Sequence, residues 1–403
     1  MEDKKKLADA SDMSEEEWNK ALDEWIEERN RKRGEIFIPP VGIYPPELKA
    51  GLETGVNNEW VTTDLIRHYA DALGDKNPLW RDERYAKRTR WGGIIAPPTF
   101  IDCIAPTFTQ DKTSMPPGAR ALPAGAKRRW FQVMRPGDRI HVVDQFIGVE
   151  EKKHKEKKPY RMFFDNTRRT YINQRDEVVA IADCPLIMPV FHRFEDQKSA
   201  LNQNVVKHKY TQEELDEIHR NYEEDKPRGS DTRFWEDVSV SDEMKPFIAG
   251  PLTGADGAAM VAAIGYLGAF GINWELIKAN FAWHHIDPET GDYNRGSEVH
   301  FNDITGKIRG GTRSFTFGAH SEGLLSRLIT NWMGDDGFMK RLDAETRRPW
   351  YFGDAVWVKG KVTKKYVENN EHLVDLEVFC ENQVGTVNET GTATVRLISR
   401  SEF

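Results

Sequence analysis

The chain has 403 residues, 38% of them hydrophobic and 30% charged, with a formal net charge of -8 at pH 7. A chain of this length is too long for one ordinary hydrophobic core, so we expect at least two domains. The proportions of hydrophobic and charged residues are those of a folded, soluble protein. The acidic charge argues against a nucleic-acid partner. The sequence lacks an apolar run long enough for a membrane span or a signal peptide, so we expect no membrane association.

The three cysteines, Cys103, Cys184 and Cys380, are far apart and odd in number. This spacing indicates reduced thiols and a cytoplasmic location. Neither the cysteines nor the histidines have metal-ligand spacing, so we expect no metal. The glycines around 265–271 and 310–311 do not follow the G-x-G-x-x-G pattern after a strand, which disfavours a Rossmann nucleotide site.

The first fifty residues predict a helical clasp and a connector. Residues 14–33 place Trp18 and Leu22 on one face of a helix, and Ser14 can cap its start. We expect this helix to pack on the body of the protein. The proline-rich stretch that follows predicts an extended connector, so residues 1–50 form a unit of their own.

A first domain is expected over residues 51–205. It begins with a helix over about 63–73 and continues with residues 127–147 and 161–189, which are rich in β-branched and aromatic side chains. That composition, broken by turn signals, predicts long antiparallel strands. Residues 206–232 are polar and are expected to form a linker with one short helix.

The remaining residues, 233–403, repeat this order of elements. Helices are expected over 254–266 and 318–333, and strand-like composition returns over 345–399. Such a repeat predicts two similar domains side by side. Their sheet edges would either cover each other or pair into one continuous sheet.

Short matching segments support the repeat. RRWFQVMRPGD at 128–138 corresponds to RRPWYFGD at 347–354, which aligns Gly137-Asp138 with Gly353-Asp354. Likewise, Asn173-Gln174 corresponds to Asn382-Gln383.

A known family is recognisable in these motifs. The segment Tyr69–Ala86 contains Gly-Asp-x-Asn-Pro-Leu-Trp and resembles the Gly-Asp-x-Asn-Pro-Leu-His signature of MaoC-like (R)-specific enoyl-CoA hydratases and acyl dehydratases. APPTF at 96–100, Arg-Pro-Gly-Asp at 135–138 and LLSRLITNWMGDDGF at 324–338 are similar to further parts of that family. The resemblance implies an α+β double hot-dog fold, with two long antiparallel sheets each wrapped around a central helix.

The resemblance also implies an activity: addition or removal of water across the α,β double bond of an enoyl-CoA thioester. No cofactor is implied, because coenzyme A is part of the substrate. In this family an Asp and a His hold the water, and a glycine amide at the start of the central helix binds the thioester oxygen. The chemistry is physically sound, since an N–H at a positive helix end stabilises the developing enolate.

The first half departs from this pattern. Asp75 is present, but Trp80 stands at the histidine position, and indole cannot shuttle a proton. Pro97 stands at the oxyanion glycine and has no N–H, and Ala105 stands at a family serine. We therefore expect a degenerate site, with Asp75 and Trp80 at the wall of an acyl pocket for a bulky or branched substrate. Asp75 as a simple turn residue stays an alternative.

The second half carries the complementary residues. VHFND at 299–303 resembles the family's Leu-His-x-Asp, which implies that His300 is catalytic. Gly318 falls at the oxyanion glycine and Ser326 at the serine. A structural role for His300 and a packing role for Ser326 stay open.

The carboxylate partner is not at its usual place, because Arg295 occupies the family's Asp position. Asp292 and Asp287, in the insertion before His300, are the leading replacements. Asp256 and Glu298 are further candidates.

Basic residues next to the strands are candidates for coenzyme A phosphates, among them Arg128 and Arg347, although a surface role is equally open. The expected partners are an acyl-CoA thioester and a second copy of the chain in a homodimer. Two rival functions remain: a lyase or thioesterase on the same fold, and a non-catalytic acyl-CoA-binding or assembly subunit.

Overall fold

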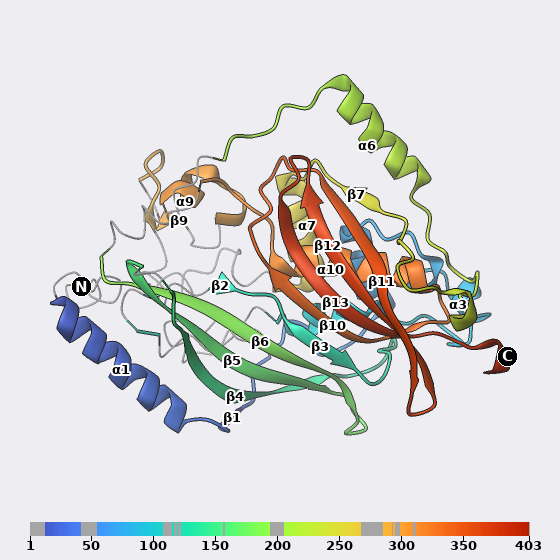
Figure 1. Cartoon of the computed structure of the whole chain (residues 1–403), viewed down its shortest axis with the longest axis horizontal. Helices are drawn as coiled ribbons and strands as arrows, with labels where there is room; N and C mark the ends of the chain where they lie inside the picture. Colours follow the sequence, from blue (N-terminus) through green and yellow to red (C-terminus); the bar gives the residue numbers. More distant parts are fainter. Residues whose placement is uncertain are drawn as a thin grey trace.

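The computed structural model describes residues 13–41, 55–107, 115–116, 119, 122–155, 158–193, 205–266, 285–291, 293–294, 299–308 and 312–402. Within these ranges one antiparallel sheet of eleven strands runs through both halves of the molecule, green in the first half and red in the second (Figure 1). A separate two-stranded pair is formed by β8 (His285–Ile286) and β9 (Tyr293–Asn294).

The first half of the sheet contains β1 (Ile36–Phe37), β2 (Leu122–Pro123), β3 (Lys127–Trp130), β4 (His141–Lys152), β5 (Tyr160–Ile172) and β6 (Val178–Phe191). The second half contains β7 (Phe247–Ala249), β10 (Phe338–Thr346), β11 (Val356–Glu368), β12 (Glu371–Asn382) and β13 (Val387–Arg396). The long strands expected from the β-branched composition are therefore present.

The two halves are joined by a direct strand pair. The strand order is β1-β4-β5-β6-β3-β10-β13-β12-β11-β7, in which β3 pairs with β10 and places Arg128 opposite Leu342. Of the two arrangements expected for the sheet edges, the continuous sheet is the one observed. Because each half uses its inner edge to pair with the other, neither inner edge is left open to aggregation.

The longer helices are α1 (Glu15–Arg31), α2 (Thr63–Ala72), α6 (Gln212–Glu224), α7 (Gly254–Ile264) and α10 (Gly318–Met333). Short helical pieces are η2 (Pro78–Trp80), α3 (Glu83–Ala86), η3 (Pro98–Phe100), α4 (Ile101–Ile104), η4 (Trp235–Asp237), α9 (Asp303–Ile308) and η8 (Arg400–Glu402). The helices expected near 14–33, 63–73, 212–222, 254–266 and 318–333 are all present.

The central helix of the second half is α10. Nearly all of its side chains are buried, including Leu324, Leu325 and Leu328, and it packs against β10 to β13. The helix also buries polar residues, among them Glu322 and Arg327, so it lies inside the core on all sides and those side chains need buried partners. Its counterpart in the first half is much shorter: η3 continues into α4, which ends at Ile104 because Ala105 is extended. α10 packs against η3, so the two central elements meet in the middle of the molecule.

The internal repeat is confirmed by equivalent hydrogen bonds in the two halves. Gln174 Nε2 donates to Asp138 Oδ1 at 3.3 Å, and Gln383 Nε2 donates to Asp354 Oδ1 at 3.0 Å. The amides of Gly137 and Gly353 likewise donate to the segment just before α2 and α7, respectively. The double hot-dog fold expected from the sequence is therefore present.

The N-terminal clasp is also present. A capping box of Ser14 and Glu17 starts α1, and its buried Trp18 and Leu22 join a cluster with Phe163 of β5. The satisfied N-terminal amides and the buried face explain why this segment forms a helix and covers the sheet of the first half.

The junction between the halves gives a sharp stability test. Gly125 has a φ of +96°, and a Cβ there would lie 2.2 Å from the carbonyl oxygen of Ala344 on β10. Gly137 has a similar φ of +93° but nothing within 4 Å of a Cβ. We expect Gly125→Ala to lower the free energy of unfolding by about 3 kcal/mol or more, because backbone strain and overpacking add. Gly137→Ala should lose only about 1 kcal/mol, from strain alone.

Urea denaturation of both variants measures this difference. Equal losses for the two alanine variants would contradict the close approach of the two halves at Gly125.

Candidate active site

The N-terminus of α10 has the properties of an anion-binding position. The helix starts at Gly318, and Phe317 at the N-cap is extended. Among the described residues no side chain caps this end by a hydrogen bond. The first amides of a helix lack intrahelical acceptors and carry partial positive charge, so they can bind a developing oxyanion. Gly318 is the first residue of α10, and its role as the oxyanion glycine stays a prediction.

His300 is held at the same helix end. Its ring stacks on Phe317, with 3.9 Å between ring centroids and 27° between planes, and meets Phe315 edge-on. Its Nδ1 lies 2.9 Å from the carbonyl oxygen of Phe315. Since a carbonyl can only accept, Nδ1 carries the hydrogen, and in the neutral ring Nε2 keeps its lone pair. This is the tautomer that a base acting through Nε2 needs.

The carboxylate partner of His300 stays a prediction. Asp292 and Glu298 lie outside the described residues. Asp287 accepts from the amides of the two turn residues Glu289 and Thr290 through one oxygen, at 2.7 and 3.1 Å. Asp256 forms the capping box of α7 with the residue at its N-cap, Thr253.

Ser326 lies deep in α10. It is 1% exposed, and its Oγ has no hydrogen-bond partner among the described residues. It stands eight residues after Gly318, which corresponds to about 12 Å along the helix axis. That spacing separates it from the amide of Gly318, so packing stays as open for Ser326 as a functional role.

The degenerate motif of the first half forms a closed turn. Asp75 is buried, and its two oxygens accept hydrogen bonds from the amide of Asn77 and from Nε1 of Trp80, both at 2.9 Å. Burial raises the pKa of Asp75, while Arg327 and these two donors act against that rise. The carboxylate therefore holds the indole that replaces the family's histidine, as a turn residue does.

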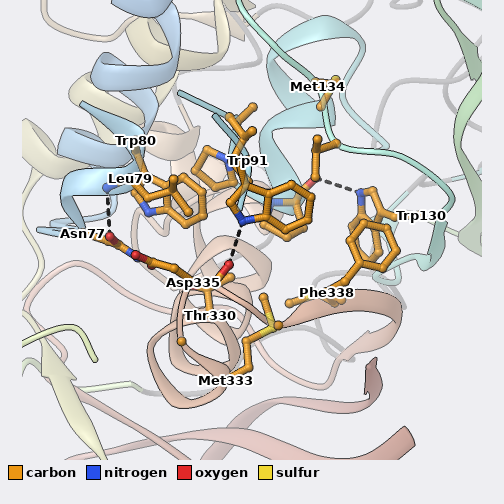
Figure 2. Close-up of a pocket in the computed structure, with 18 of the residues that line it drawn as sticks. Asn77, Leu79, Trp80, Trp91, Trp130, Met134, Thr330, Met333, Asp335 and Phe338 are labelled. Atoms are coloured by element: carbon orange, nitrogen blue, oxygen red, sulfur yellow. Dashed lines mark hydrogen bonds between the residues drawn. The ribbon is translucent and has the colours of Figure 1, made fainter. Parts of the chain in front are cut away.

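A pocket lies over this motif (Figure 2). Three tryptophans, Trp80, Trp91 and Trp130, line it together with the C-terminal end of α10 at Thr330 and Met333. Trp91 Nε1 donates to the carbonyl of Asp335 at 2.7 Å, and Trp130 Nε1 donates to that of Pro98 at 2.9 Å. Because all three indole N–H groups have acceptors, the rings contribute apolar surface to the wall. Asp75 does not line the pocket but supports Trp80 from behind.

The expected contact of Arg128 with coenzyme A phosphates is wrong. Arg128 is fully buried, with ion pairs to Asp102 and Glu322. The neighbouring Lys127 is exposed, as strand alternation demands, and only the middle residue of the basic run points inward. Arg347, by contrast, is exposed and pairs with Glu345 at the surface, so its contact with a phosphate stays a prediction.

Sequence reasoning assigned no role to Glu322. It lies in α10 one turn after Gly318 and is 3% exposed. The available signal was a carboxylate in a helix expected to lie at the centre of the second half, a placement that demands a buried partner.

Two absences apply to the described part of the chain only. There, no group of three or more His, Cys, Asp or Glu side chains is arranged to hold a metal ion. None of the helices in those ranges has the length and apolarity that crossing a membrane requires.

A known family model matches the first half of the chain. Residues 49–182 match the family model described as the FAS1-like dehydratase domain region. A UPF0336 protein of Streptomyces avermitilis is 34% identical over 94 residues, which are 22% of this chain and 63% of that protein. The 3-oxo-4,17-pregnadiene-20-carboxyl-CoA hydratase beta subunit of Mycobacterium tuberculosis is 33% identical over 78 residues, 19% of this chain and 55% of that protein. The chain thus covers less than two thirds of either relative.

Solved structures match across both halves. A MaoC-like dehydratase superposes with a TM-score of 0.59 at 15% identity, covering 91% of this chain and 98% of the other. A conserved hypothetical protein of Mycobacterium tuberculosis, described as a double hotdog fold, gives 0.51 at 11% identity, with coverage of 91% and 96%. These matches and the repeat define a double hot-dog protein. The family match is confined to residues 49–182, so the first half is similar to the dehydratase region, and the matches across both halves establish the fold.

The Asp75–Trp80 contact gives a pH-dependent test. We expect Trp80→Phe to lower the free energy of unfolding by about 1–3 kcal/mol, because a buried carboxylate loses a donor. The loss should grow as pH rises, since ionised Asp75 needs that donor more than the protonated acid does. Urea denaturation at pH 5 and pH 8 measures the effect.

Trp91→Phe is the matched control. Its indole donates to a neutral backbone carbonyl, so its cost should be the same at both pH values. A pH-independent loss for Trp80→Phe would show that Asp75 is not the group this indole stabilises.

Proposed function

We propose that the protein adds water to, or removes it from, the α,β double bond of an acyl-CoA thioester, with the chemistry in its second half. The observation that carries this proposal is the placement of His300 on Phe317, with Nδ1 bonded to the carbonyl of Phe315. That contact assigns a hydrogen to Nδ1, and the ring stacks on Phe317, the residue that precedes the first residue of α10. The names of relatives such as the hydratase beta subunit support the same reaction class.

The residues divide the reaction as follows. In hydration, Nε2 of His300 takes a proton from the attacking water as its oxygen bonds to the β-carbon. The negative charge then moves to the thioester oxygen, where the amide of Gly318 and the helix end stabilise it. The enolate collapses as its α-carbon takes the proton from His300, which returns the imidazole to its neutral form. A carboxyl group from the insertion before His300, with Asp292 the leading candidate, would help to hold the water. Dehydration reverses these steps. No cofactor takes part, because coenzyme A belongs to the substrate.

A bulky or long acyl group is part of the proposal. The tryptophan-lined pocket supplies an aromatic wall, and Thr330 in that wall lies twelve residues after Gly318. This separation is about 18 Å along the helix, so an acyl group would need considerable length to reach from one to the other. Arg347 as a phosphate contact and the homodimer rest on the sequence and the family resemblance.

Substitution of the histidine tests the proposal. We expect His300→Ala to lower kcat for hydration of enoyl-CoA esters by about 10²–10⁴-fold, because the proton acceptor is lost. Absorbance of the conjugated thioester follows the reaction for short, long and ring-containing acyl groups. His219→Ala, at an exposed position of α6, is the control and should retain full activity.

Three outcomes would contradict the proposal in different ways. A protein that binds acyl-CoA but hydrates none of the esters would be a binding or assembly subunit. Release of free coenzyme A would indicate a thioesterase. If His300→Ala stays active while Asp75→Ala does not, the chemistry belongs to the first half.

A further inference from the structure

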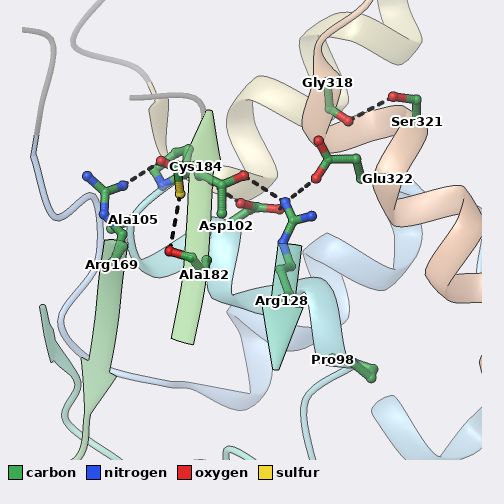
Figure 3. Close-up of polar contacts among 12 residues, drawn as sticks. Pro98, Asp102, Ala105, Arg128, Arg169, Ala182, Cys184, Gly318, Ser321 and Glu322 are labelled. Atoms are coloured by element: carbon green, nitrogen blue, oxygen red, sulfur yellow. Dashed lines mark hydrogen bonds and ion pairs between the residues drawn. The ribbon is translucent and has the colours of Figure 1, made fainter. Parts of the chain in front are cut away.

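A buried guanidinium connects the two halves beneath the proposed oxyanion position (Figure 3). Arg128 of β3 lies 3.2 Å from Asp102 Oδ2 of α4 and donates to Thr107 Oγ1 at 2.7 Å. From the other side it pairs with Glu322 of α10. The side chains of Arg128 and Asp102 are 0% exposed and that of Glu322 is 4% exposed. Each half therefore sends a carboxylate from its central helix to the same arginine.

Glu322 lies next to the start of α10. It follows Gly318 by one helical turn, and helical side chains lean back toward the N-terminus. Its Oε1 is 3.8 Å from the position that a Cβ on Gly318 would occupy. A negative charge at that place opposes the binding of an oxyanion by the amide of Gly318. The charge state of this carboxyl group consequently affects the proposed reaction.

A third carboxyl group belongs to the same buried cluster. Glu389 of β13 is fully buried, 3.2 Å from Ser321 Oγ and 3.4 Å from Thr346 Oγ1. Three carboxylates around one guanidinium cannot all be ionised at low cost. Burial raises the pKa of Glu322 to about 7 and that of Glu389 well above its ordinary value, and the two acids interact.

The remaining titratable groups that face this cluster hold their protons near neutral pH. They come from α2, α4, β5, β6 and β12, where burial raises the pKa values of Tyr69, Cys103, Tyr171, Cys184 and Cys380. On α10 itself, burial lowers the pKa of His320 to about 4, so this ring is neutral. Glu322 is therefore the group of the cluster whose ionisation falls near neutral pH.

We propose that Arg128 is a positioning residue that the first half supplies to the site of the second half. By pairing with Glu322 and Asp102 it fixes the first turn of α10 and balances the negative charge next to Gly318. The proposal rests on the proposed function. It gives the non-catalytic half a role in the reaction: through Arg128 it keeps the amide of Gly318 able to bind the oxyanion.

A pH dependence of kcat follows. Below about pH 7 the cluster is electrically balanced, because Arg128 offsets Asp102 while Glu322 holds its proton. As pH rises, Glu322 ionises, and the added charge weakens the oxyanion site. We expect kcat of the wild type to fall about 30-fold between pH 6 and pH 8.5, as a group titrating near 7 requires, with little change in KM.

Glu322→Gln is the decisive variant, because glutamine keeps the shape of the glutamate side chain but cannot ionise. We expect it to fold and to lose this alkaline fall of kcat. Arg128→Lys keeps the charge but shortens the side chain, which moves the charge away from the position where Nη2 meets Asp102, Thr107 and Glu322. We expect kcat at pH 6 to drop about tenfold with KM almost unchanged. Glu377→Gln, exposed on β12, is the control and should behave as wild type.

The results separate this proposal from the proposed function. If the wild type hydrates thioesters but Glu322→Gln keeps the wild-type pH profile, the role of Arg128 and Glu322 is overturned while the proposed function stands. If the wild type hydrates no thioester, the proposed function and the role of Arg128 in that reaction are both wrong. Unfolding in urea from pH 5 to pH 8 then tests the cluster without a measurement of activity. Folded Glu322 holds a proton that the unfolded chain releases, so this group makes wild-type stability fall as pH rises to about 7, and the fall should be smaller in Glu322→Gln.

Discussion

The pairing of β3 with β10 is the constraint on which the rest of the structure depends. It joins two similar sheets into one and fixes the side of the sheet to which each residue of β3 points. Successive side chains of a strand point to opposite faces of the sheet. Lys127 faces solvent, so the side chain of Arg128 points into the core. A buried guanidinium is tolerated only with partners. Asp102 and Glu322 meet that demand, so the sheet junction also determines how the two central helices face each other.

Local patterns in the sequence predicted the elements well. Ser14 before an apolar helical face identified the start of α1, a signal that lies within a few residues. The repeat was visible because Gly-Asp and Asn-Gln pairs recur in the same order in both halves, and the structure shows that Asp138 and Asp354 each accept from the glutamine of that pair.

Burial of charge was harder to predict, since it depends on which strands meet. Lys127, Arg128 and Arg129 form a basic run that is typical of a surface, and only the pairing with β10 shows that its middle residue is internal. Within the candidate site, His300 and Gly318 could be named from family motifs. Their meeting through Phe317, however, is a tertiary contact. Glu322 was missed because no motif marks it.

Under the proposed function, the short central helix of the first half explains how this half could lack catalysis and still be required. Pro97 has no N–H at the oxyanion position, Trp80 replaces the histidine, and α4 ends at Ile104. None of these features can stabilise an enolate. Yet η3 and α4 pack on α10 and carry Asp102 to Arg128, while Trp80 lines the pocket. A half without this chemistry no longer needs an N–H at its helix start. It still needs Asp102, because without this carboxylate Arg128 and the acids around it would lose their charge balance in the core.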